Sequence, residues 1–281
     1  MRHATPPTDP TIAAAARLLR QARSAVALSG AGISTPSGIP DFRSAGSGLW
    51  EEADPFVVAS LSGFLRRPQA FYEWVRPLAR AILAAQPNPA HVALAQLEAA
   101  GCLVAVITQN IDGLHQRAGS RCVHEVHGHL RTATCLRCRR QVATDDLLGA
   151  VVQGGAVPRC ACGGTLKPDV VLFGDLLPVD VWAAAEAAVD ACDLLLAVGS
   201  SLEVMPAAEL PVRARGRGAR LIIVNREPTG LDDLADVVVR GDVADVLPAV
   251  VEMVNLTPLP LLRKRRGSDT PFPRGGEGVG G

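Results

Sequence analysis

Short apolar segments alternate with helical ones along most of the 281-residue chain, and this alternation limits the fold more than any other feature. The apolar segments are rich in Val, Ile and Leu and mostly lack polar alternation, which is typical of strands buried on both faces of a parallel sheet. Repeated strand, helix and strand predict a doubly wound α/β domain that binds its ligand at the edge where the strands end. The predicted strands are 25–28, 103–107, 194–198, 221–224 and 237–239, and the predicted helices include 11–23, 90–100 and 179–191.

Two segments interrupt this pattern and are predicted to be insertions that pack together as a smaller lobe. Residues 51–85 are predicted to be helical and concentrate the aromatic side chains, whereas residues 131–166 carry four of the seven cysteines. The doubly wound domain is then formed by residues 1–50, 86–130 and 167–254. Residues 255–281 are rich in Pro, Gly and Arg and are predicted to be a flexible tail.

The charge and the apolar runs of the chain argue against nucleic-acid and membrane partners. Lys and Arg together number 28, as do Asp and Glu, and a net charge of zero argues against a protein that binds nucleic acids by phosphate neutralisation. No apolar run reaches the roughly 18 residues of a membrane span, and the first residues lack the apolar core of a signal peptide. We therefore expect a cytoplasmic protein with no membrane partner and no specific nucleic-acid partner.

A small-residue loop, Gly30-Ala31-Gly32, follows the first predicted strand. Such residues let the backbone turn tightly and approach a phosphate group, which indicates a nucleotide site. The next glycine is Gly38, so the G-x-G-x-x-G spacing of ordinary dinucleotide sites fails, and this speaks against a hydride-transferring dehydrogenase. A polar, proline-bounded loop follows instead and ends in Asp41-Phe42-Arg43; it suits a protein that must also reach the far end of its cofactor.

The clustered cysteines have the spacing of a zinc site. Cys135 and Cys138 form a two-residue-spaced pair, and 21 residues separate them from a second pair, Cys160 and Cys162. Four thiolates would close the coordination shell, so the predicted zinc is structural and not catalytic. The second pair is one residue shorter than usual and needs a tighter turn, and buried or redox-active thiols are the alternative interpretation.

Three histidines lie close together between residues 123 and 129. Alternation in one extended strand predicts that His127 and His129 share a face and that His124 lies opposite. Gly128 leaves space beside His127, and a histidine with an unperturbed pKa near ~6.5 is a workable general base at neutral pH.

The turn after the second strand carries polar side chains, among them Asn110 and Asp112. Their amide and carboxylate could hydrogen-bond a ribose, an amide or a water. An Asn/Asp-rich turn without a ligand is an equally good interpretation of this segment by itself.

Taken in their order along the chain, these motifs resemble those of the sirtuin family, the NAD-dependent protein deacylases. The resemblance runs from about residue 26 to residue 247. Besides the segments above, it includes Pro-Asp-Val-Val-Leu-Phe-Gly-Asp at 168–175, Gly-Ser-Ser-Leu-Glu-Val at 199–204, Asn-Arg-Glu-Pro at 225–228 and Gly-Asp-Val at 241–243.

The resemblance implies a Rossmann-like, doubly wound parallel sheet that binds NAD, with a small inserted zinc-binding lobe and a helical insertion. NAD, as co-substrate, and a protein or peptide containing acyl-lysine would meet in the cleft between the lobes. The implied cofactor-binding residues are Gly30, Ala31, Gly32, Asp41, Phe42, Arg43, Gln109, Asn110, Ile111, Asp112, Gly199, Ser200, Ser201, Asn225, Arg226, Glu227 and Val243. The implied catalytic residues are His127 and Asn110, the zinc ligands are Cys135, Cys138, Cys160 and Cys162, and the acyl-lysine contacts are Val171, Phe173 and Gly174, partly as an added strand.

The implied reaction removes an acyl group from lysine. The acyl oxygen attacks the ribose carbon as nicotinamide leaves, and His127 then acts as general base through the ribose hydroxyls. Phe42 and its loop would keep water away until then. The products would be lysine, nicotinamide and O-acyl-ADP-ribose.

Family members that prefer acidic acyl groups share a Tyr-x-x-Arg pair, and here Tyr72 is followed three residues later by Val75. We therefore favour acetyl or another neutral acyl group over succinyl or malonyl. Two alternatives remain: a protein ADP-ribosyltransferase on the same fold, and a non-catalytic sensor of NAD or acyl-lysine. The retained His127, Asn110 and Asp112 speak against the sensor, because a binder has no need of a general base.

Overall fold

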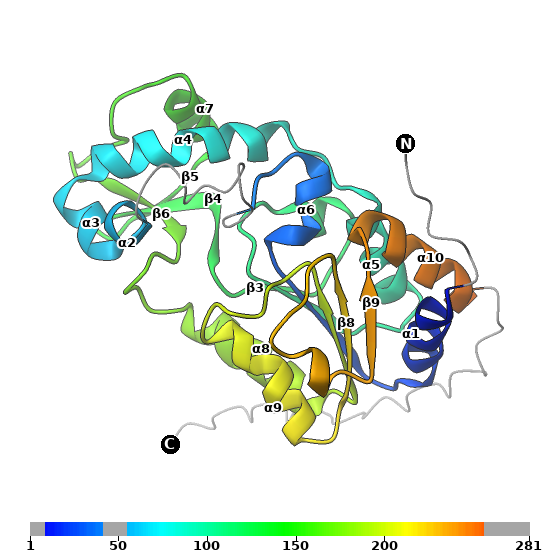
Figure 1. Cartoon of the computed structure of the whole chain (residues 1–281). Helices are drawn as coiled ribbons and strands as arrows, with labels where there is room; N and C mark the ends of the chain where they lie inside the picture. Colours follow the sequence, from blue (N-terminus) through cyan, green and yellow to red (C-terminus); the bar gives the residue numbers. More distant parts are fainter. Residues whose placement is uncertain (1–8, 42–54, 256–281) are drawn as a thin grey trace, which may run out of the picture.

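The computed structural model describes residues 9–41 and 55–255, and its larger part is a six-stranded parallel sheet (Figure 1). The strand order is β3-β2-β1-β7-β8-β9, so the chain runs outward from β1 in one direction and from β7 in the other. This confirms the predicted doubly wound sheet and puts its switch point between β1 and β7. The strands are β1 (Ala25–Ser29), β2 (Ala105–Thr108), β3 (Val123–Glu125), β7 (Leu194–Val198), β8 (Arg220–Asn225) and β9 (Val237–Arg240).

Helices cover both faces of this sheet, which explains why the strands are continuously apolar. All residues of β1 and β7 are buried. Helices α1 (Pro10–Gln21), α5 (Pro89–Ala99) and α10 (Val243–Asn255) pack on one face (Figure 1). Helices α8 (Val179–Ala191) and α9 (Leu210–Gly216) pack on the other. Shorter helical segments are α6 (Leu114–Arg117), η1 (Ala31–Ile33), η2 (Thr35–Ser37), η3 (Ala207–Glu209) and η4 (Asp232–Leu234).

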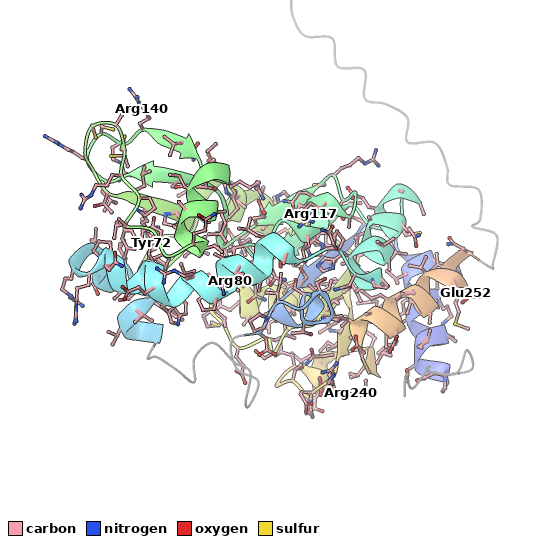
Figure 2. The ribbon with its side chains drawn as sticks, turned by 90° about the horizontal axis from the view of Figure 1, so that it is seen from above. Tyr72, Arg80, Arg117, Arg140, Arg240 and Glu252 are labelled. Carbon is pink, nitrogen blue, oxygen red and sulfur yellow. The ribbon has the colours of Figure 1, made fainter. Side chains whose placement is uncertain are left out.

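A smaller lobe is built on a three-stranded antiparallel sheet, β5-β4-β6, formed by β5 (Gln141–Ala143), β4 (Gly128–Cys135) and β6 (Leu166–Val170). This sheet extends beyond residues 131–166 at both ends. Helices α2 (Pro55–Val58), α3 (Leu61–Arg66), α4 (Pro68–Ala84) and α7 (Asp145–Val152) lie around it. Figure 2 shows α4 running along the small lobe toward the large domain, with Tyr72 nearer the small lobe and Arg80 nearer the large domain.

The histidine segment is not the single strand that the sequence predicted. It breaks at Val126 and His127, between β3 of the large sheet and β4 of the small one. Gly128 makes the break possible: its φ is +74°, and a Cβ there would lie 2.0 Å from the carbonyl oxygen of Asp169. His127 therefore lies where the two sheets meet. Among the helices of the described residues, none has the length and apolarity needed to cross a membrane.

Candidate functional site

A cavity of about 640 Å³ lies where the carboxyl ends of the large-sheet strands face the small lobe. Sequence reasoning assigned 21 residues to NAD, catalysis or acyl-lysine, and the described ones all line this cavity. Phe42 and Arg43 lie outside the described residues. The lining set is Gly30, Ala31, Gly32, Asp41, Gln109, Asn110, Ile111, Asp112, His127, Val171, Phe173, Gly174, Gly199, Ser200, Ser201, Asn225, Arg226, Glu227 and Val243.

The loops after β1 and β7 touch each other at the switch point, and this contact requires glycine on both sides. The backbone N–H of Gly32 donates to the carbonyl oxygen of Gly199 at 2.8 Å. A Cβ on Gly32 would lie 2.8 Å from that oxygen, and a Cβ on Gly199 would lie 2.4 Å from the nitrogen of Ile33. Gly199 also has a φ of +57°, in the left-handed region. The glycines that were assigned to a phosphate therefore also hold two loops together.

Asn110 and Asp112 project from the turn after β2 toward the first loop. The Asn110 amide donates to the carbonyl oxygen of Gly30 and to Ser34 Oγ, both at 3.0 Å. Asp112 accepts from Ser34 Oγ at 2.7 Å and from the N–H of Leu114 at 2.9 Å. Burial raises the pKa of Asp112, and these two hydrogen bonds oppose the rise. Ser34, which sequence reasoning did not single out, joins both side chains.

His127 is oriented by a backbone carbonyl. Its Nδ1 lies 3.1 Å from the carbonyl oxygen of Gln109, which can only accept, so Nδ1 carries the proton and Nε2 keeps its lone pair. Burial lowers the pKa of His127 below its usual value, and the bond to Gln109 partly opposes this. The ring is therefore neutral at pH 7, with Nε2 able to accept a proton. The Gln109 side chain in turn donates to Ser200 Oγ at 3.1 Å.

The segment after β6 closes the cavity on the small-lobe side. The N–H of Val171 donates to the carbonyl oxygen of His127 at 2.9 Å. Phe173 is bound through its backbone: its N–H donates to Ala59 and its carbonyl accepts from Leu61, both at 2.9 Å. Both backbone groups of Phe173 are thus engaged within the chain, which leaves less of this segment for pairing with an added strand.

An apolar wall on α4 lines the same cavity, and the sequence analysis used only Val75 of this wall, as a determinant of the acyl group. Val75, Leu78 and Ile82 recur at helical spacing, the signal that could have identified this face. Two polar side chains of α4 do not line the cavity, because each is bound to the backbone of the small lobe. The Tyr72 hydroxyl donates to the carbonyl oxygen of Leu166 at 2.8 Å, and Arg76 Nε donates to the carbonyl oxygen of Val151 at 2.9 Å. The α4 side of the cavity is therefore uncharged.

Polar residues lie at the opposite end of the cavity, after β8 and at the start of α10. The Asn225 amide donates to the carbonyl oxygen of Glu227 at 2.8 Å, and Arg226 pairs with Asp242 at 2.7 Å. Val243 begins α10 beside them. The polar side chains at this end of the cavity therefore bind neighbouring groups of the protein, whereas the wall on α4 is apolar.

The four clustered cysteines meet in the small lobe, and their sulfur atoms all lie within 4.8 Å of one another. Cys135 Sγ is 3.5 Å from Cys162 Sγ, and Cys138 Sγ is 3.7 Å from Cys160 Sγ. Tetrahedral zinc with Zn–S bonds of about 2.3 Å requires sulfur separations of about 3.8 Å, so the cluster fits the ion.

Local contacts explain how the shortened second cysteine pair closes the cluster. Gly163 has a φ of +81°, and its N–H donates to the carbonyl oxygen of Cys160 at 2.8 Å, which makes the tight turn. A Cβ on Gly164 would lie 2.6 Å from Cys135 Sγ. Hydrogen bonds to the Cys135 sulfur lower the pKa of that thiol to about 6, and the largest effect comes from the backbone N–H of Cys138, whose nitrogen lies 3.5 Å from Sγ. None of the four cysteines lines the cavity, which fits a structural metal.

Comparison with known proteins gives the same result. The model of the Sir2 family matches residues 30–206. An NAD-dependent protein deacetylase of Sulfurisphaera tokodaii is 48% identical over 238 residues, which cover 84% of this chain and 93% of the relative. NAD-dependent protein deacylase 2 of Archaeoglobus fulgidus is 48% identical over 242 residues, which cover 85% and 94%.

Solved structures agree in fold as well as sequence. One that presents the structural basis for the mechanism and regulation of Sir2 enzymes superposes with a TM-score of 0.83 at 47% identity, covering 88% of this chain and 98% of the other. Sir2Af2 bound to a myristoylated histone peptide gives 0.76 at 42% identity, covering 88% and 97%. A Sir2 variant with a deacetylated p53 peptide and 3′-O-acetyl-ADP-ribose gives 0.80 at 40% identity, covering 84% and 96%. The chain therefore belongs to the Sir2 family, the sirtuins.

Proposed function

We propose that this protein is an NAD-dependent protein-lysine deacylase. It removes acetyl or another neutral acyl group from lysine and yields nicotinamide and O-acyl-ADP-ribose. The observation that carries the proposal is a neutral His127, with Nε2 free to accept a proton, on a cavity that also holds the glycine loop and the Asn110 and Asp112 side chains. This combination supplies a general base next to groups suited to a nucleotide.

NAD lies, in this proposal, along the edge of the large sheet. Its adenosine half is held near Asn225 and Val243, and its pyrophosphate lies against the touching loops that contain Gly32 and Gly199. The nicotinamide end faces Asn110 and Asp112. Because Asp112 is held by Ser34 and the N–H of Leu114, it is already oriented before any ligand arrives.

His127 acts as the general base in this assignment. NAD supplies the ribose carbon that receives the acyl oxygen, together with nicotinamide as leaving group. The Gln109 carbonyl holds the Nδ1–H tautomer of His127, so that Nε2 takes the proton from a ribose hydroxyl. The lowered pKa of His127 keeps this atom unprotonated at neutral pH.

The acyl chain lies against the α4 wall, with Val75 at the position where members that prefer acidic groups carry arginine. An apolar wall stabilises a neutral acyl group by burial, whereas a carboxylate there would lose its hydration without gaining a cation. The acyl-lysine itself contacts Val171, Phe173 and Gly174. We assign the protein to the cytoplasm, where reducing conditions keep the zinc-binding thiols from forming disulfides.

The test is mass spectrometry of an acetyl-lysine peptide incubated with the protein, with and without NAD. The proposal expects NAD-dependent loss of acetyl and formation of O-acetyl-ADP-ribose, both abolished by His127→Ala. His124→Ala is the matched control, because His124 lies on β3 and does not line the cavity. ADP-ribosylated protein in place of O-acetyl-ADP-ribose would indicate a transferase, and NAD binding without any product would indicate a sensor.

A further inference from the structure

Two histidines that take no part in the proposed reaction are packed together beneath the site. His91 of α5 is 0% exposed and His115 of α6 is 1% exposed. Their ring centroids are 5.0 Å apart, in an edge-on arrangement. Each ring has one nitrogen with a hydrogen-bond partner, whereas His91 Nε2 and His115 Nδ1 are buried without one. An unpartnered buried nitrogen is costly, so two of them side by side need an explanation.

The partnered nitrogens fix which atoms carry protons. The backbone N–H of Asn88 donates to His91 Nδ1 at 3.4 Å, so the proton of neutral His91 is on Nε2. Ser29 Oγ donates its single proton to Thr108 Oγ1 at 2.9 Å. His115 Nε2, 2.8 Å from Ser29 Oγ, must then be the donor, and His115 Nδ1 keeps its lone pair. The two unpartnered atoms are therefore one donor and one acceptor.

We propose that His91 Nε2–H donates to His115 Nδ1, directly or through one buried water, and that the two histidines are positioning residues for the NAD-binding loop. This loop comprises residues 30–37. The bond joins two atoms of complementary type on rings that already touch. It leaves neither buried nitrogen unpaired.

Both ends of the resulting chain of hydrogen bonds hold this same loop. Beyond His91, the Asn88 amide donates to the carbonyl oxygen of Ile33 at 2.8 Å and to Ser37 Oγ at 2.9 Å. Beyond His115, Ser29 reaches Thr108, whose Oγ1 accepts from the N–H of Asn110 at 3.1 Å.

The side-chain amide of Asn110 returns this chain of hydrogen bonds to the loop, because it donates to the carbonyl oxygen of Gly30 and to Ser34 Oγ. Contacts at both ends of the loop are thus connected through the two imidazoles. A change at His115 is expected to loosen the loop at both ends and to weaken binding at the cavity that the loop lines. The inference rests on the proposed function only in taking NAD as the ligand of that cavity.

Calorimetric titration of NAD into the full chain tests the positioning role. His115→Phe fills the space but removes the donor and the acceptor, and we expect the Kd for NAD to rise about tenfold. His115→Gln offers an amide N–H to Ser29 and a carbonyl to His91, so its Kd should stay within about twofold of the wild type. Leu94→Ala, a fully buried change in the same helix α5, is the control for lost stability alone: it should lower the Tm and leave the Kd unchanged.

Long-range proton–nitrogen NMR of the histidine rings at pH 7 tests the assignment without NAD. We expect both rings to be neutral with the proton on Nε2. A proton on Nδ1 of His115, or equal Kd values for His115→Phe and His115→Gln, would overturn the inference. If the wild-type protein does not bind NAD at all, the proposed function fails instead, and the ring protons still decide whether the pair exists.

Discussion

The ammonium group of Lys167 lies 2.8 Å from Asp175 Oδ2 and 2.8 Å from the carbonyl oxygen of Val170. The two side chains are only 12% and 25% exposed. Lys167 sits within β6, whereas Asp175 ends the segment that carries the proposed acyl-lysine contacts. The ion pair therefore connects the strand before residues 171–174 to the residue directly after them.

Lys167→Met keeps most of the side-chain volume and removes the charge, which leaves the Asp175 carboxylate without its cation. We expect the KM for an acetyl-lysine peptide to rise about tenfold, because a partly buried charged hydrogen bond is worth roughly 1.5–3 kcal/mol. The kcat and the KM for NAD should stay within about twofold. Steady-state kinetics with each substrate varied in turn measures the three constants.

The matched control is Arg23→Met, which removes an ion pair to Asp193 from a side chain that is 93% exposed. Such surface pairs contribute little, so this variant should behave as the wild type. A rise in the KM for NAD equal to that for peptide, in Lys167→Met, would mean that the ion pair supports the whole protein and not the peptide segment.

Local patterns were sufficient to predict the large sheet, because its strands are buried on both faces and lie between amphipathic or apolar helices. They did not assign Val123, His124 and Glu125 to the large sheet, because this extended segment forms a short edge strand without an apolar run. The break at His127 also escaped prediction, because it depends on the close approach of Gly128 to Asp169, which is distant in sequence.

The site was predictable where a short motif contains the functional side chains, as in the four cysteines and the polar turn with Asn110. It was not predictable where distant segments meet. The packing of the small lobe decides which face of α4 opens to the cavity. Apolar residues at helical spacing predict only a buried helix face, not a face that lines a ligand cavity. The same holds for His91 and His115, whose contact joins residues from two different helices.

Gly32→Ala should abolish NAD binding and lower the free energy of unfolding by about 1–3 kcal/mol. The new Cβ would lie 2.8 Å from the backbone oxygen of Gly199, and this loop contact cannot relax by moving a flexible side chain. Gly149→Ala is the control, because it lies in α7 with open space around it and should be neutral or stabilising by about 0.5–1 kcal/mol. Urea denaturation and NAD titration of both variants compare them, and normal NAD affinity in Gly32→Ala would refute the steric argument.

Zinc removal should loosen the small lobe and leave the large sheet folded. We expect a single zinc ion per chain by elemental analysis, and Cys138→Ser should lose it and lower the Tm, since a closed four-thiolate site contributes folding energy directly. Cys122→Ser is the control: Cys122 is half-buried, lies next to His124 and is not part of the cluster. Full zinc content in Cys138→Ser would show that the other three thiolates suffice.

The pH dependence of deacylation should report His127. Burial lowers its pKa below 6.5, so Nε2 is free at neutral pH and becomes protonated only in more acidic solution. We expect kcat/KM to be constant near pH 7 and to fall on the acid side with an apparent pKa below about 6.5. Rates measured from pH 5 to 8 with saturating NAD test this, and an acid limb centred above pH 7 would assign the base to another group.

The buried histidine pair should make the protein less stable in mild acid. Burial lowers the pKa of His91 to about 4 and that of His115 to about 3, whereas both have values near 6.5 when unfolded. Below pH 6.5 the unfolded chain therefore binds protons that the folded chain does not, and stability falls as the pH is lowered toward 4. Each histidine should cost on the order of 2 kcal/mol between pH 7 and pH 5.

Urea denaturation at pH 7, 6 and 5 measures this dependence, with the double variant His91→Gln and His115→Gln as the comparison. Glutamine does not titrate, so the double variant should lose most of the slope. The remainder would come from His124 and His127, whose pKa values burial also lowers. The carboxylates with lowered pKa values, such as Asp169, lose their contribution mainly below pH 5, outside this range. An unchanged slope in the double variant would mean that the acid sensitivity does not come from this pair.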